Sequence, residues 1–223
     1  MKVVDLTQTL DERTVLWPGS EPFTAVADDG YDADGYWSRH LSTPEHAGTH
    51  LDAPIHCVPG GAAVGDISAE QLVRPAVRID ARALCGGDPS WVLRAADVEA
   101  WEAEHGRVPE GAAVLLCTGW DAYRTDPAAY LGEPLGFPGY GGDAAALLVE
   151  RGAAGLGIDT LGVDAGASTD HAVHRTALPA GLWHLEGLVR LDAVPDTGAT
   201  LVVGALRLPG ASGAPARVFA LLP

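Results

Sequence analysis

Lysine is almost absent from this chain: Lys2 is the only one among its 14 basic residues. These face 30 acidic residues, which leaves a formal net charge of −16 at pH 7 over 223 residues. A chain of this charge repels a phosphate backbone and an anionic lipid surface. We therefore expect no nucleic-acid partner and no membrane partner. The surplus carboxylates either solvate the surface or, in part, hold cations.

Cysteine is scarce as well, and Cys57, Cys85 and Cys117 form no closely spaced pair. Three thiols cannot all form disulfides within one chain, and scattered thiols are typical of a reducing compartment. No uninterrupted apolar run approaches the ~18–20 residues that span a bilayer. The N-terminus reaches Asp5 without the apolar stretch of a secretory signal. We expect a cytoplasmic protein.

Glycine and proline are spread along the chain, which shows no repeat and no linker. Its length suffices to bury a sizeable core, so we expect a single domain over 1–223. Helices are predicted at 95–105 and 142–151. Strands are predicted at 3–10, 77–79, 113–117, 154–160, 201–208 and 218–222, with a turn at 209–215. A helix followed by a buried strand is typical of α/β organisation, so the predicted fold class is one mixed α/β domain.

The most informative stretch is 46–56, which reads HAGTHLDAPIH. Three histidines and an aspartate all occupy even positions, and alternate residues of an extended chain point to one side. Such a segment would therefore place four side chains on one face: His46, His50, Asp52 and His56. Imidazole nitrogens and carboxylate oxygens are ligands that zinc and manganese accept. The pattern predicts a site for a divalent metal.

A straight strand would hold His46 and Asp52 roughly 20 Å apart, which is too far for both to bind one ion. The chain must bend between them, and Gly48 is the residue that bends at least cost. Pro54 cannot donate to a strand ladder and should end the extended piece. The segment is therefore predicted to be bent rather than a regular strand.

The pattern H-x-G-T-H-x-D-x-P-x-H resembles the signature of the cyclase-like metal-dependent hydrolase family, of the kynurenine formamidase and isatin hydrolase type. Further blocks resemble that family in the expected order: DLT at 5–7, WPG at 17–19, TGWD at 118–121, GIDT at 157–160 and EGL at 186–188. The resemblance implies an α/β domain of the cyclase type, with a sheet core or a barrel-like sheet surrounded by helices. It also implies a homodimer or a higher homo-oligomer.

The same resemblance assigns metal ligands residue by residue: His46, His50, Asp52, His174 and Glu186. Asp52 would bridge to a second ion in two-metal members, and His56 matches a residue that shuttles protons. The residues alone do not distinguish His174 from His171. The resemblance decides this choice and sets His184 aside, although His184 has the same strand parity as Glu186.

Some positions depart from the family pattern, which leaves the substrate open. Ser20 follows the WPG block, where the family usually has an aspartate. Cys57 follows the last histidine of the motif, where an aromatic residue is common, and Gly162 stands where a serine is frequent. We expect Cys57 to be a pocket wall or an oxidation-prone thiol. Trp17 and Trp120 are candidates to line an aromatic substrate pocket, and ordinary core packing is the alternative for both.

These residue types indicate a reaction class. A metal with an open position lowers the pKa of bound water towards about 7 and polarises a carbonyl, so hydroxide on the metal can attack an amide or lactam carbon. His56 would take the water's proton and pass it to the leaving nitrogen. The sequence thus predicts a metal-dependent hydrolase of a small amide, such as the aryl-formamide N-formylkynurenine or a lactam, with one or two Zn or Mn ions per subunit. A biosynthetic cyclase or dehydratase with the metal as Lewis acid, and a metal-binding protein without catalysis, are the alternatives.

The two kinds of residue in the motif can be separated by mutation. We expect Asp52→Ala to lose the bound metal, because it removes a ligand. His56→Ala should keep the metal and lose about 100-fold or more of turnover, the usual contribution of a general acid–base group. Elemental analysis and turnover measured on the same preparations check both results. Normal turnover of the His56 variant would contradict the proton-shuttle assignment.

Overall fold

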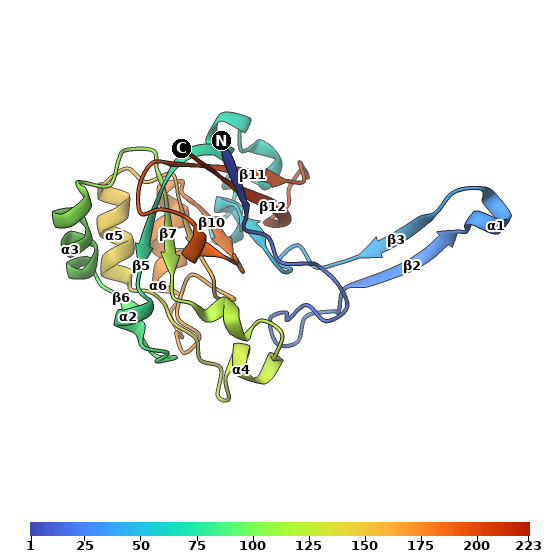
Figure 1. Ribbon diagram of the computed structural model, residues 1–223, viewed down its shortest axis with the longest axis horizontal. Coiled ribbons are helices and arrows are strands. Elements are labelled where there is room, and N and C mark those ends of the chain that lie inside the picture. The colour runs from blue at the N-terminus through green and yellow to red at the C-terminus, as the bar shows by residue number, and fades with distance from the viewer.

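The computed structural model describes residues 1–223, and its central element is a sheet that closes on itself (Figure 1). Neighbouring strands follow the order β1 (Lys2–Asp5), β12 (Gly213–Leu222), β11 (Ala199–Ala205), β5 (Val73–Asp80), β7 (Ala113–Cys117), β9 (Gly155–Ile158), β10 (Trp183–Glu186) and β4 (His50–Asp52). Because β4 pairs with both β10 and β12, the ring closes and β1 lies outside it. The predicted mixed α/β class and barrel-like sheet are confirmed.

The strands β5, β7, β9 and β10 run parallel, and helices cover their outer face. Successive residues of β7 show the alternation: Leu115 lies in an apolar cluster shared by strands all round the ring, whereas Leu116 packs in a second cluster with the helices. The helices of the second cluster are α3 (Ala95–His105), α5 (Gly142–Glu150) and α6 (Ala172–Ala177). The ring therefore has an apolar interior and a helix-covered exterior.

The remaining elements are short. The α-helical ones are α1 (Tyr31–Asp34), α2 (Arg82–Cys85) and α4 (Pro127–Leu131), and a small second sheet pairs β6 (Val92–Leu93) with β8 (Gly139–Tyr140). The 3₁₀ turns are η1 (Pro54–His56), η2 (Val64–Asp66), η3 (Ala69–Leu72), η4 (Trp120–Tyr123), η5 (Leu178–Ala180) and η6 (Leu191–Ala193). None of the helices combines the length and the apolar character needed to cross a membrane.

Several predicted elements have different limits in the structure. Helix 95–105 and strand 113–117 agree, whereas the opening strand ends at Asp5 instead of 10, because Thr7 makes only an isolated bridge to Leu188. The predicted turn 209–215 is also wrong at its end, since β12 begins at Gly213 and contains Pro215. Proline is tolerated there because Ala216, and not Pro215, donates its N–H to Thr49 of the neighbouring segment.

A long hairpin is among the elements that sequence reasoning missed. Its strands β2 (Thr24–Asp29) and β3 (Ser38–Ser42) pair only with each other, and together with α1 they project far from the body of the molecule (Figure 1). Five large apolar side chains of this hairpin arm are more than half exposed: Val26, Tyr31, Tyr36, Trp37 and Leu41. The arm thus carries apolar surface that its own chain does not cover.

Candidate metal centre

The pairing of β4 with β10 brings four polar side chains together. In this antiparallel ladder His184 lies opposite Asp52, and Glu186 lies opposite His50, so all four point to the same face. All four are buried. The chain enters β4 through Gly48, which has φ +61°, and leaves it at Pro54, the first residue of η1. The predicted bend at Gly48 and the predicted end of the strand are both confirmed.

Asp52 lies at the centre of the histidines. Its Oδ1 is 2.7 Å from His46 Nδ1 and 3.3 Å from His50 Nε2, and its Oδ2 is 3.5 Å from His174 Nε2. Glu186 spans the same gap, with Oε2 at 3.3 Å from His50 Nε2 and Oε1 at 3.6 Å from His174 Nε2. The structure therefore brings together the five side chains that the resemblance assigned to metal binding: His46, His50, Asp52, His174 and Glu186.

Hydrogen bonds orient two of these rings. His50 Nδ1 lies 3.0 Å from the carbonyl oxygen of Gly48, and His174 Nδ1 lies 2.6 Å from Oδ2 of Asp164. Each ring then donates from Nδ1 and directs the lone pair of Nε2 at the carboxylates, as metal-binding histidines commonly do. Asp164 also accepts from the backbone N–H of Val173 and His174 at the start of α6. Sequence reasoning missed Asp164, because no spacing relates it to the motif.

His46 is oriented from the opposite side. Its Nε2 lies 2.9 Å from the hydroxyl of Ser212, and that hydroxyl donates to Glu45 at 2.7 Å. His46 Nδ1 then donates to Oδ1 of Asp52 at 2.7 Å. With Ser212 accepting from Nε2, a metal that replaced the Nδ1 proton would meet the Nδ1 lone pair. Each of the three histidines therefore turns one ring nitrogen toward the carboxylates, where a metal could take the place of a proton.

The buried atoms of this cluster fit a divalent cation. His50 Nε2, Asp52 Oδ2 and both ring nitrogens of His184 are buried without a hydrogen-bond partner. Buried polar atoms are rarely left so, because each costs about 1–3 kcal/mol. Imidazole and carboxylate donors that converge in this way suit zinc or manganese.

The electrostatics favour a bound positive charge. Burial alone would lower the pKa of His50, but Asp52 and Glu186 outweigh it and raise that pKa to about 10. The pKa of His174 is likewise raised well above its ordinary value against burial by Asp164 and Asp52. Burial would raise the pKa of Asp52, yet the neighbouring histidines hold it well below its ordinary value. A field that stabilises added protons also stabilises a metal cation in their place.

The cluster forms one wall of a cavity of about 690 Å³, a volume typical of small-molecule sites. His56 and Cys57 line it, and the His56 ring centroid is 4.3 Å from that of His46 and 5.7 Å from that of His174. Burial lowers the pKa of His56, so its ring is neutral and can accept a proton. Burial raises the pKa of the Cys57 thiol, so this residue of the cavity wall is a protonated thiol.

The two candidate tryptophans have different surroundings. Trp17 is 43% exposed and lines the cavity, where its ring meets that of Phe137 edge-on. Trp120 is 5% exposed, donates from Nε1 to the carbonyl of Tyr130 and packs in an apolar cluster behind the wall. Trp17 therefore lies at the cavity, whereas Trp120 packs in the core.

A hydrogen-bond network away from the cavity holds the ligand-bearing strands in place. Thr49 accepts from the backbone N–H of Gln8 at 3.0 Å and donates to the carbonyl of Gly187 at 2.6 Å. Gly187 has φ +63°, and a Cβ there would lie 2.5 Å from the carbonyl oxygen of Gly48. Since Thr49 precedes a ligand and Gly187 follows one, this contact fixes β4 against the end of β10.

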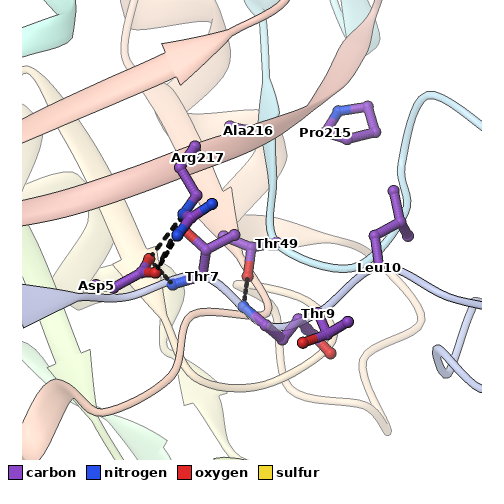
Figure 2. A pocket seen from close by; sticks show the side chains of 9 residues that line it. Asp5, Thr7, Thr9, Leu10, Thr49, Pro215, Ala216 and Arg217 are labelled. Carbon is purple, nitrogen blue, oxygen red and sulfur yellow. Dashed lines mark hydrogen bonds and ion pairs between the residues drawn. The ribbon is translucent and has the colours of Figure 1, made fainter. Parts of the chain in front are cut away.

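Figure 2 shows the hollow in which Thr49 lies, a space of about 440 Å³ bounded by the segment from Asp5 to Leu10 and by Pro215, Ala216 and Arg217 of β12. Its charged groups, Asp5 and Arg217, pair with each other at 2.6 Å. No histidine or cysteine lines it. The residues of this hollow therefore belong to the network that holds the strands in place.

Comparison with known proteins agrees with this geometry. The family model described as "Putative cyclase" matches residues 4–165. The chain belongs to the cyclase family. It is 32% identical to the isatin hydrolase of Roseibium aggregatum, over 86% of this chain and 78% of that protein. It is 30% identical to the kynurenine formamidase of Bacillus mycoides, over 96% and 94% of the two chains.

Among solved structures of the cyclase family, isatin hydrolase A from Ralstonia solanacearum superimposes with a TM-score of 0.93 at 36% identity, covering 100% of this chain and 92% of the other. The resemblance proposed from the motif is thus confirmed. The prediction of a metal-dependent hydrolase of a C–N bond is confirmed at the level of the family.

The contact between Asp164 and His174 yields a test of the centre. We expect Asp164→Asn to weaken binding of zinc by about 10- to 100-fold, because the loss of such an orienting carboxylate lowers the basicity and order of the ring. Chelator competition with the metal-free protein measures the affinity. Asp170→Asn is the matched control, since Asp170 lines the same cavity and only accepts from Ser168. Equal affinities for the two variants would contradict the orienting role.

Proposed function

We propose that this protein hydrolyses a small aromatic amide with two divalent ions, zinc or manganese, held on either side of Asp52. The observation that carries the proposal is the position of the Asp52 carboxylate, one oxygen of which faces His46 and His50 while the other faces His174. A carboxylate so placed is suited to bridge two ions. One oxygen of Glu186 faces His50 and the other faces His174, which supports two ions rather than one.

The chain's own residues supply the remaining chemistry. When bound, a divalent ion would act as a Lewis acid toward a carbonyl and lower the pKa of a water. His56 lies in the cavity wall next to His46, and its neutral ring can accept a proton and return it to a leaving nitrogen. Trp17 offers an aromatic ring edge or face to the substrate in the same cavity.

The relatives suggest the substrate class. Isatin and N-formylkynurenine, the compounds that the names of the relatives indicate, share a bond between a carbonyl carbon and a nitrogen attached to a benzene ring. We propose this N-aryl amide bond as the one that the protein cleaves. Because this chain superimposes on isatin hydrolase A from Ralstonia solanacearum with a TM-score of 0.93, we propose a cyclic amide as the preferred substrate.

A panel assay tests the function. We expect the metal-loaded protein to hydrolyse isatin or N-formylkynurenine faster than an aliphatic formamide or a simple ester. Chelation should abolish the activity, zinc or manganese should restore it, and elemental analysis should find two ions per chain. A metal-loaded protein that hydrolyses none of these compounds would favour a cyclase or dehydratase, or a metal-binding protein without catalysis.

We propose in addition that the protein is a homodimer in which the hairpin arm contacts a second copy. An isolated two-stranded hairpin is at best marginally stable in water, so the arm needs a surface to pack against. Its exposed rings, among them Tyr31 and Trp37, which stack on each other at the tip, suit an apolar contact. The homodimer expected from the resemblance remains a prediction.

Light scattering tests the dimer. The wild-type protein should have twice the mass of one chain, and the double variant Tyr31→Ser, Trp37→Ser should shift toward the monomer, because it removes apolar contact area from the arm. Tyr123→Ser, which alters an exposed ring on the body, is the control. A monomeric wild-type protein would contradict the proposal.

We also propose that residues 1–223 act as one domain in the cytoplasm. All three cysteines are free in the structure, which is typical of a reducing compartment.

A further inference from the structure

His184 is a buried histidine that neither the motif nor the proposed mechanism uses. It lies on β10 directly opposite Asp52 and two residues before Glu186, and its side chain has no solvent exposure. Neither of its ring nitrogens has a hydrogen-bond partner. An imidazole carries a donor and an acceptor when neutral, so the fold leaves both unpaired, which is unfavourable for buried polar atoms.

The neighbours of His184 explain what could offset that cost. One ligand atom of His184 lies within 4.8 Å of one from each of three buried side chains, Asp52, His174 and Glu186. Its ring also meets that of His174 edge-on, with 4.7 Å between centroids. The strand register brings the ring to this place: His50-x-Asp52 and His184-x-Glu186 lie antiparallel, so each histidine lies beside a carboxylate of the other strand.

We propose that His184 is the fourth protein ligand of the ion bound by Asp52, His174 and Glu186. Two imidazoles and two carboxylates make a set of four that suits tetrahedral zinc. The assignment rests on the proposed function, because it requires that this ion be bound. It adds a ligand that the motif resemblance set aside.

The consequence is that the two halves of the centre differ. An ion with four protein ligands keeps no open position for water or substrate. The other ion lies on the side of His46 and His50, where the His46 side chain is 27% exposed and His56 lines the cavity, so water or substrate would reach that ion and add to its ligands. The buried ion would act by fixing the Asp52 carboxylate and by its charge.

Replacement by leucine distinguishes a ligand from a core residue. His184→Leu fills a similar volume and removes two unpaired polar atoms, so the metal-free variant should unfold at no lower urea concentration than the metal-free wild type. If His184 is a ligand, the tighter zinc site should weaken by at least about 10- to 100-fold, the loss seen even for partners outside the ligand set. Chelator competition and elemental analysis measure this without reference to activity.

The matched control is His171→Asn. His171 lines the cavity beside His174 but lies outside this cluster of ligand atoms, and asparagine tolerates its left-handed backbone at φ +50°. The control should bind zinc as the wild type does. Wild-type zinc affinity in His184→Leu would overturn the assignment of His184 alone, whereas a wild-type protein that binds no zinc would overturn the metal-dependent function and the assignment together.

A second variant gives a positive signal. In His184→Cys a small, apolar-tolerant side chain replaces the ring, and Co²⁺ bound at this site should show a thiolate charge-transfer band in the near ultraviolet. The wild-type protein, which retains Cys57 in the cavity wall, supplies the baseline. Appearance of the band places residue 184 in the ligand set. Absence of the band together with unchanged zinc affinity in His184→Leu overturns the proposal.

Discussion

The antiparallel register of β4 and β10 is the constraint on which the site depends. Leu51 and Leu185 are partners in this ladder, and both lie fully buried in the apolar interior of the ring. Since alternate residues face opposite sides, the burial of these two leucines turns His50, Asp52 and the side chains opposite them outward to α6. A slip of one residue would place the carboxylates in the apolar interior, so hydrophobic packing selects the register that builds the site.

The cost of gathering these groups explains how the surrounding network is arranged. Two carboxylates and several imidazoles held out of water are unfavourable unless each charge is paired. The molecule orients the ligands by contacts that turn one nitrogen of each ring toward the carboxylates: Gly48 holds His50, Ser212 holds His46, and Asp164 holds His174. Of the 30 acidic residues, those at this centre take part in cation binding by our proposal, whereas the others need no such role.

The sequence could predict the parts of the site that local geometry determines. Even spacing from 46 to 56, a bend at Gly48 and a stop at Pro54 follow from strand alternation and from backbone limits, and the structure contains them. It could not predict Asp164 or the placement of His184, because both depend on which strands pair and where α6 begins. The hairpin arm was missed for a related reason, since its apolar residues are exposed on an arm that projects from the body and do not pack in the core.

The residues that line the cavity and the residues held in paired strands come from different parts of the fold. Groups that act on a substrate must reach open space, and Trp17 and His56, which we propose for that role, line the cavity from outside the strands, as His46 does. Groups that bind a cation must be held rigidly, and the candidate ligands Asp52, His184 and Glu186 come from paired strands. Asp52 ends β4 and contacts His46 through one oxygen and His174 of α6 through the other, so it connects the paired strands to side chains of two other segments. A change in its position would therefore disturb both sides of the centre together.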